Sequence, residues 1–196
     1  MGQRRVDGHQ QVEAWLAANG GRGWGNLETI AWLAALAHHG QKRKYTEEPY
    51  IVHPLEVADL IDRTIPVCSW RMVATALLHD TLEDTLLPQE LIGSIDPHLL
   101  EMVLAVTDVS TPADGNRAAR KQKDLEHIAT ASPDAKAVKL ADLISNSRSI
   151  VARDAEFAKV YMQEKRALLD VLKDSSSHEL YEMARDIVDN YFAVST

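Results

Sequence analysis

The chain has 196 residues, of which 45% are hydrophobic and 26% are charged, as in a globular protein with one well-buried core. Its formal net charge of −8 argues against general binding to nucleic acid or to acidic membrane surfaces. Its single cysteine, Cys68, excludes an intramolecular disulfide and a zinc site built from cysteines, and it fits a cytoplasmic protein.

Helical periodicity runs through most of the chain, and no segment alternates for long enough to predict a strand. The first predicted helix covers about 26–39 and stops at Gly40, and an irregular loop rich in Lys, Arg and Glu follows at 41–49. Further helices are predicted, in chain order, near 54–63, from an N-cap at Ser69 through Asp84, and near 88–95, 97–107, 117–131, 133–152, 154–173 and 177–194.

These elements predict an all-α bundle of roughly eight to ten helices. We expect one domain over 1–196, with its core at about 27–172 and a C-terminal helix at about 177–194. No apolar stretch approaches the roughly 20 residues that span a bilayer. The N-terminus also lacks the apolar segment of a signal peptide.

The segment 74–85 has an unusual layout, because an apolar helix ends in His79, Asp80, Glu83 and Asp84. At roughly 100° per residue, these four polar groups would lie within about 140° of one helical face. Imidazole and carboxylate groups beside an apolar run suggest a metal site with a proton-handling carboxylate. A solvated acidic helix end is the alternative, although acidic groups there oppose the helix dipole.

His53 precedes Pro54 at a predicted helix start and follows the apolar Ile51 and Val52, so its ring is expected to point inward. A buried histidine usually needs a hydrogen-bond partner or a metal ion. Taken alone, His53 is more often a core histidine than a ligand.

A third polar segment lies within the predicted helix near 133–152. Asp142, Asn146 and Ser149 follow an i, i+4, i+7 spacing, with Lys139 one turn earlier and apolar residues on both sides. A polar stripe between apolar borders favours a buried site over an ordinary exposed stripe.

Together the three segments offer two histidines and two aspartates, His53, His79, Asp80 and Asp142, as a set of nitrogen and oxygen ligands. Such a set suits Mn, Fe or Zn, and the absence of thiolates argues against structural zinc. A metal with open positions lowers the pKa of a bound water, and Glu83 and Asp84 are placed to orient that water or to shuttle its proton.

A local supply of positive charge exists for an anionic substrate. Lys42, Arg43 and Lys44 follow one another in the loop, and Arg43 is suited to stacking on a base or pairing with phosphate. Lys139 and Arg148 lie near the expected metal. A second basic cluster consists of Arg117, Arg120, Lys121 and Lys123. Solvated surface charge is the better explanation for most of these basic residues individually, and Lys42 and Lys123 are predicted to be surface charges of this kind.

These segments resemble the HD-domain hydrolases of the RelA/SpoT type, which degrade guanosine tetra- and pentaphosphate alarmones. The resemblance rests on four stretches, 37–44, 48–54, 76–85 and 138–146, whose order and spacing agree, and it covers about Leu27–Leu172. Because the chain is short, it resembles a stand-alone alarmone hydrolase of the stringent response.

The resemblance implies an HD fold that binds Mn²⁺ through His53, His79, Asp80 and Asp142, with Glu83 and Asp84 as the catalytic pair. It also implies nucleotide binding by Arg43, Lys44, Lys139, Asn146, Arg148 and Ser149. The implied reaction removes the 3′-pyrophosphate and leaves the nucleoside 5′-di- or triphosphate.

Two departures bear on these expectations. The loop sequence is Arg-Lys-Tyr-Thr-Glu-Glu-Pro-Tyr where the long enzymes have Arg-Lys-Ser-Gly-Glu-Pro-Tyr, so Tyr45 and Glu47 are added and a glycine is lost. This change leaves guanine or adenine (ppGpp or ppApp) open as the base. Leu143 also stands where a basic residue commonly follows the metal-binding aspartate.

Two other functions remain open from the sequence. One is an HD phosphatase for nucleoside monophosphates, which can use the same ligands but has no need of the Arg43–Lys44 loop. The other is a non-catalytic alarmone-binding or antitoxin-like protein, against which the Glu83–Asp84 pair counts. In each case the expected partner is a small nucleotide, neither nucleic acid nor a membrane is expected, and homo-oligomerisation is left open.

Overall fold

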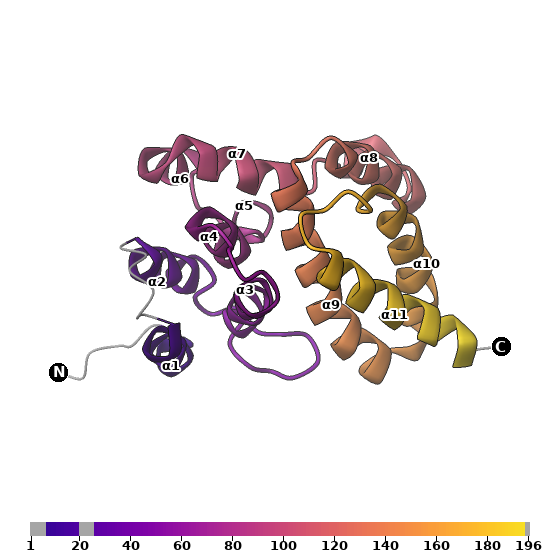
Figure 1. Ribbon diagram of the computed structural model, residues 1–196, viewed down its shortest axis with the longest axis horizontal. Helices are drawn as coiled ribbons and strands as arrows, with labels where there is room; N and C mark the ends of the chain where they lie inside the picture. The colour runs from indigo at the N-terminus through magenta and orange to yellow at the C-terminus, as the bar shows by residue number, and fades with distance from the viewer. Residues whose placement is uncertain (1–6, 20–25, 195–196) are drawn as a thin grey trace. The chain divides into compact units, whose positions relative to one another are not determined.

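The computed structural model describes residues 7–19 and 26–194 of the chain (Figure 1). Every regular element within these ranges is a helix, and the only β-type pairing among them is an isolated bridge between Lys42 and Pro49. The predicted all-α class is therefore confirmed. No helix of the described part is long and apolar enough to cross a membrane. Residues 1–6, which bear on the signal-peptide prediction, lie outside the described ranges.

The chain forms two compact units, Met1–Glu101 and Met102–Thr196. The helices of the first unit are α1 His9–Asn19, α2 Leu27–Ala37, α3 Val52–Thr64, α4 Trp70–Leu78, α5 Thr81–Asp84 and α6 Gln89–Ile95. The division between the units falls within α7 Pro97–Val106. The second unit contains the 3₁₀ turn η2 Pro112–Asp114 and the helices α8 Arg117–Ala129, α9 Pro133–Arg153, α10 Ala155–Val171 and α11 His178–Val194.

The first unit is built around α4, which packs against both α2 and α3 (Figure 1). All its residues from Met72 to Leu78 are buried, so α4 is a core helix with no solvated face. The predicted cap is confirmed, because the Ser69 hydroxyl accepts a hydrogen bond from the Met72 amide at 3.3 Å. Burial of α4 fixes the place where its C-terminal residues emerge.

The helix that carries the polar segment 79–84 ends earlier than predicted. α4 stops at Leu78, and Asp80 takes the N-cap position of the separate short helix α5. Two side chains compete for carbonyls that helical amides would otherwise use: His79 Nδ1 lies 2.7 Å from the Ala76 oxygen, and the Thr81 hydroxyl donates to the Leu78 oxygen at 2.7 Å.

The continuous helix predicted through Asp84 is therefore interrupted between Leu78 and Thr81, although His79 and Asp80 keep right-handed helical backbone angles. The carboxylates of Glu83 and Asp84 lie in the first turn of α5 and not at the end of a long helix. A helix start favours negative charge, so the expected conflict with the helix dipole does not arise.

Helix α1 is an element that the sequence pattern did not predict. Only Val12 and Trp15 of its residues are buried, so its apolar pattern is weak. Its position is set by tertiary contacts, since α1 packs on α2 and α3 and the Trp15 indole donates to Asp59 of α3 at 2.8 Å.

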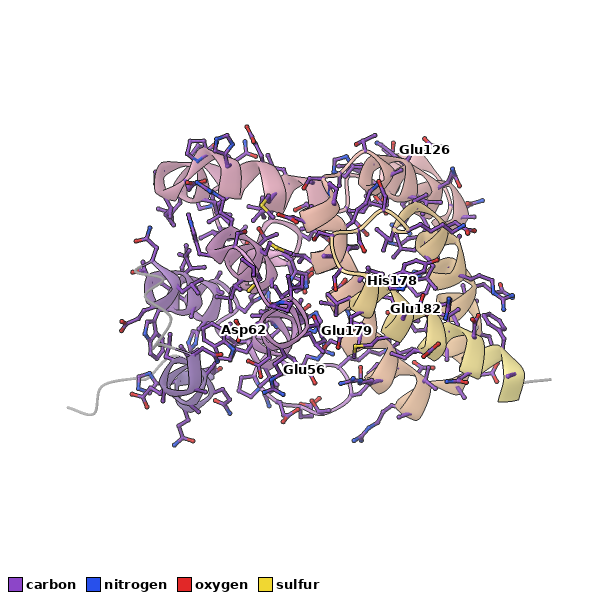
Figure 2. All side chains as sticks on the ribbon, viewed as in Figure 1. Glu56, Asp62, Glu126, His178, Glu179 and Glu182 are labelled. Carbon is purple, nitrogen blue, oxygen red and sulfur yellow. The ribbon has the colours of Figure 1, made fainter. Side chains whose placement is uncertain are left out.

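The second unit is organised around the long helix α9, which packs against α10 and α11. α11 buries Leu180, Ala184 and Val188 at an i, i+4, i+8 spacing, while Glu179 and Glu182 mark its polar side (Figure 2). The amphipathic pattern near 177–194 thus folds as predicted.

One ion pair ties together the helices of the first unit. The Arg71 guanidinium of α4 binds the Asp96 carboxylate in a bidentate manner, at 3.0 and 2.7 Å. Asp96 Oδ1 also accepts a hydrogen bond from the Leu99 amide at 2.8 Å, which caps the start of α7. The hydrogen bonds from Arg71 lower the pKa of Asp96 to about 2.

We expect Asp96→Ala to lower the free energy of unfolding at pH 7 by about 1–2 kcal/mol, the size of a lost helix cap with a partly solvated ion pair. Because the pKa of Asp96 is depressed on folding, its contribution is present above about pH 4 and disappears as the pH falls toward 2. Urea unfolding at pH 7 and pH 3 measures both effects. Glu101→Ala, which removes an exposed carboxylate from α7, is the control. Equal loss at both pH values would contradict the assignment.

Candidate metal centre and nucleotide site

Three predicted ligands converge in the first unit. His53 lies in the first turn of α3 and is fully buried, His79 caps the end of α4 and is 2% exposed, and Asp80 follows it. The two imidazoles approach through their Nε2 atoms, which are 3.2 Å apart. Asp80 Oδ2 lies 3.1 Å from His79 Nε2 and 3.5 Å from His53 Nε2. Two nitrogens and one oxygen thus share a small buried volume.

The protein fixes the orientation of His79. Its Nδ1 lies 2.7 Å from the Ala76 carbonyl oxygen, and since a carbonyl oxygen only accepts, Nδ1 is the protonated nitrogen. In the neutral ring, Nε2 is then left with a lone pair that faces His53 and Asp80. A backbone carbonyl behind the ligating ring is the usual support of a metal-binding histidine.

Asp80 is oriented by a residue that the sequence did not single out. The Tyr50 hydroxyl donates to Asp80 Oδ2 at 2.6 Å, and the Tyr50 ring stacks on His38 with a centroid distance of 4.6 Å. Tyr50 lies within the stretch that carried the resemblance, but a tyrosine in a loop has no local pattern that reveals such a bond.

This donor set fits a divalent cation. A separation of 3.2 Å between the nitrogens suits two ligands of one cation bound at about 2.1 Å each. Mixed imidazole and carboxylate ligands suit manganese, iron or zinc. A cation would also balance the cost of burying lone pairs that face one another.

Glu83 and Asp84, the predicted catalytic pair, are exposed on α5, one turn beyond these ligands. Although Asp84 as a whole is exposed, partial burial of its carboxyl and the nearby charge of Asp80 raise the pKa of Asp84 above its ordinary value. The side-chain amide of Gln41 donates to the Asp84 backbone oxygen at 2.7 Å, and Gln41 Oε1 in turn accepts from His38 Nδ1 at 2.7 Å. Two residues that sequence reasoning missed therefore hold this turn.

The loop predicted at 41–49 is a tight hairpin that places Arg43 and Lys44 at its tip. It is closed by hydrogen bonds from the Arg43 amide to the Glu48 oxygen, 2.9 Å, and from the Glu47 amide to the Arg43 oxygen, 3.1 Å. Arg43 lies 5.9 Å from the centre of the Tyr50 ring, and Lys44 donates to the Tyr45 hydroxyl at 3.1 Å. The hairpin thus runs directly into the tyrosine that orients Asp80.

Glu47 occupies a left-handed conformation with φ of +60°. This conformation favours glycine, and Glu47 closes the loop where the resembled sequences have their glycine. The longer loop therefore keeps a left-handed closing residue and fills it with a strained glutamate.

The remaining predicted residues lie on α9 of the second unit. Asp142 is buried and accepts a hydrogen bond from Asn146 Nδ2 at 2.7 Å, and Lys139 Nζ lies 3.9 Å from its other oxygen. These contacts confirm the predicted stripe. The Ser149 hydroxyl donates to the Asn146 carbonyl at 3.0 Å, and Arg148 is exposed. Neither observation tests the roles predicted for Arg148 and Ser149.

The second basic cluster is largely neutralised by carboxylates. Arg117 binds Glu164 at 2.7 Å, and Lys123 binds Asp114 at 2.8 Å. Exposed Lys42 lies 3.6 Å from Glu47. Lys42 and Lys123 fit the prediction of ordinary surface charge, whereas Lys121 is half-buried and binds Asp108 at 2.5 Å.

Comparison with known proteins places this site in a family. The sequence model of the HD domain matches residues 31–171, which is more than half of the chain and includes all the predicted ligands. The chain belongs to the HD-domain family. It is a metal-dependent phosphohydrolase of this type.

Several relatives carry informative names. The zebrafish (Danio rerio) guanosine-3′,5′-bis(diphosphate) 3′-pyrophosphohydrolase MESH1 is 37% identical over 63% of this chain and 68% of its own length. The human protein of the same name is 35% identical over 63% of this chain and 69% of its own. A GTP pyrophosphokinase of Myxococcus xanthus is 36% identical over 60% of this chain but only 16% of its own.

Solved structures share the fold of this HD-domain protein. A metazoan ortholog of SpoT, described as hydrolysing ppGpp, aligns with a TM-score of 0.75 and 26% identity over 83% of this chain and 93% of its own. A Listeria monocytogenes protein aligns with a TM-score of 0.62 over 76% of this chain and 99% of its own; at 21% identity this likeness concerns the fold alone.

We expect Tyr50→Phe to weaken the binding of a divalent cation by about 10- to 100-fold, because it removes the hydrogen bond that orients Asp80. Isothermal titration with Mn²⁺ measures the change. Tyr45→Phe, at a neighbouring position of the hairpin, is the matched control. Unchanged Mn²⁺ affinity in Tyr50→Phe would show that Asp80 needs no such support.

We expect Glu47→Gly to raise the free energy of unfolding by about 0.5–1 kcal/mol, because it relieves the left-handed strain. The exposed ion pair with Lys42 that this change removes contributes little. Glu48→Gly, at a neighbouring exposed position where φ is not positive, should instead be destabilising. Urea denaturation compares the variants, and a loss of stability in Glu47→Gly would contradict the account of the loop.

Proposed function

We propose that this HD-domain protein is an Mn²⁺-dependent 3′-pyrophosphohydrolase that cleaves guanosine 3′,5′-polyphosphate alarmones into pyrophosphate and the nucleoside 5′-di- or triphosphate. One observation carries the proposal: the hairpin that bears Arg43 and Lys44 leads into Tyr50, whose hydroxyl orients Asp80 beside His53 and His79. The basic hairpin proposed to bind the nucleotide is thereby linked directly to the proposed metal ligands. The names of the MESH1 relatives support the choice of substrate.

The proposed metal ligands are His53, His79, Asp80 and Asp142. The first three converge within the first unit, and Asp142 is proposed from the family pattern and from its burial on α9. When bound, the cation polarises a phosphoryl oxygen and lowers the pKa of water. The Ala76 carbonyl orients the ring of His79, and the Tyr50 hydroxyl orients the carboxylate of Asp80.

Glu83 and Asp84 are proposed to hold and move the proton of the attacking water. Their place in the first turn of α5 keeps them close in sequence to His79 and Asp80 and leaves both residues exposed. The raised pKa of Asp84 brings this carboxyl closer to the value that suits a proton acceptor and donor near neutral pH.

Substrate binding is proposed for Arg43 and Lys44 on the hairpin and for four residues of α9: Lys139, Asn146, Arg148 and Ser149. Guanidinium and ammonium groups recognise phosphate, and Arg43 can also stack on a purine. The added Tyr45 and the glutamate at position 47 change the hairpin tip, so adenine alarmones are the second candidate substrate.

We also propose that the two compact units act together as one HD domain, since the family match at 31–171 includes residues of both. The low cysteine content and acidic charge support a cytoplasmic protein whose partner is a small nucleotide.

The decisive assay incubates the protein and Mn²⁺ with ppGpp, ppApp or GMP and identifies the products by ³¹P NMR. We expect pyrophosphate from ppGpp, and Asp80→Ala should reduce its release at least about 1,000-fold because a metal ligand is lost. Glu90→Ala, which removes an exposed carboxylate from α6, is the control, and circular dichroism checks that each variant is folded.

Other products would point to the other functions. Orthophosphate from GMP without pyrophosphate from ppGpp would support a nucleoside monophosphate phosphatase. Tight ppGpp binding without turnover in Mn²⁺ would support a non-catalytic alarmone-binding protein. Undiminished pyrophosphate release by Asp80→Ala would overturn the proposed chemistry.

A further inference from the structure

His38 is a buried histidine at the end of α2, in the first unit. Its backbone amide donates to the Ala34 oxygen at 3.0 Å, so it caps the helix, and the residue is only 2% exposed. Neither the proposed metal ligands nor the proposed catalytic pair includes it. A leucine or phenylalanine would fill such a position without the cost of burying two ring nitrogens, so the imidazole is expected to have a polar task.

The Nδ1 atom of His38 directs the side chain of Gln41. The Gln41 amide nitrogen donates to the Asp84 backbone oxygen at 2.7 Å, and because a carbonyl oxygen can only accept, this bond fixes which end of the amide faces α5. Gln41 Oε1 therefore faces His38, and Nδ1 donates to it at 2.7 Å. Asp84 is the last residue of α5. The two hydrogen bonds thus run from the end of α2 to the turn that carries the proposed proton-handling pair.

The ring of His38 also supports Tyr50. The two ring centroids are 4.6 Å apart and the planes are tilted by 31°, which is an attractive arrangement for aromatic rings. The Tyr50 ring contacts His53 as well, with centroids 6.0 Å apart, and its hydroxyl donates to Asp80 at 2.6 Å. A shift of the Tyr50 ring would therefore draw the hydroxyl away from the Asp80 carboxylate.

The other ring nitrogen of His38 shows what this residue costs. Nε2 is buried and has no hydrogen-bond partner within the described part of the chain. A buried polar atom without a partner lowers stability. Phenylalanine would supply a flat ring without this cost, and asparagine would supply a donor of similar reach without a ring. A histidine combines the contact with Gln41 and the contact with Tyr50 in one side chain.

We propose that His38 is a positioning residue that couples the metal ligand Asp80 to the turn of Asp84. Its ring face keeps the Tyr50 hydroxyl on Asp80, and its Nδ1 atom holds α5 through Gln41. The proposal rests on the proposed function, which assigns Asp80 to the cation and Asp84 to the proton of the attacking water. Because the two contacts use different parts of the imidazole, different substitutions remove them separately.

Mn²⁺ binding tests the contact with Tyr50. We expect His38→Asn, which removes the ring, to weaken Mn²⁺ binding about three- to tenfold in isothermal titration, the range expected for one aromatic pair. His38→Phe keeps a ring and should stay within about twofold of wild type. His39→Asn and His39→Phe are the matched controls, because His39 is the next residue and is exposed. Equal Mn²⁺ affinity in the two His38 variants would overturn the proposal.

Hydrogen exchange of the backbone amides of α5 tests the contact with Gln41 without any turnover. We expect His38→Phe to speed this exchange about tenfold, the effect of one lost hydrogen bond, and to lower kcat for ppGpp by a similar factor at saturating Mn²⁺ with KM unchanged. His38→Asn keeps the donor and should leave the exchange close to wild type. Exchange as slow in His38→Phe as in wild type would overturn the proposal.

Gln41→Met removes the same link from its other end and serves equally if His38→Phe does not fold. The double variant His38→Phe/Gln41→Met should exchange no faster than Gln41→Met alone, because both changes break one chain of hydrogen bonds. Faster exchange in the double variant would indicate separate packing damage and would contradict the coupling. If the Mn²⁺ and exchange patterns hold but wild type does not cleave ppGpp, the positioning role of His38 stands and the proposed function fails.

Discussion

The approach of His53, His79 and Asp80 is the constraint on which the first unit depends. Two imidazole nitrogens lie 3.2 Å apart, with a carboxylate oxygen 3.1 Å from one of them, in a place from which water is almost excluded. Burial of these groups is costly, and their lone pairs face one another. The Ala76 carbonyl oxygen orients the His79 ring, and the Tyr50 hydroxyl orients the Asp80 carboxylate. The proposed cation would offset the cost of burying their lone pairs.

The break between α4 and α5 follows from the same constraint. When His79 turns its Nδ1 to the Ala76 oxygen, it occupies the carbonyl on which the next turn of the helix depends. Helix α5 then starts afresh at Asp80 and presents Glu83 and Asp84 in its first turn. The device that orients a ligand thus also positions the proposed proton-handling pair, and Gln41 fixes the end of that turn.

Much of the fold could be predicted from local signals in the sequence. The Ser69 cap, the Gly40 stop and the apolar spacing of α11 are each encoded within a few residues, so these elements were predicted close to their observed bounds. The end of α4 was not, because side-chain competition for carbonyls leaves no periodic signal. The bond from Tyr50 to Asp80 joins residues 30 positions apart, so no local pattern in the sequence reveals it.

The account places one divalent cation between the imidazoles of His53 and His79. Anomalous diffraction at the manganese edge from crystals grown with Mn²⁺ tests this claim most directly. We predict one strong peak within coordinating distance of both Nε2 atoms and of an Asp80 carboxylate oxygen. A protein that binds Mn²⁺ only elsewhere, with the two Nε2 atoms still 3.2 Å apart and no peak between them, would contradict it.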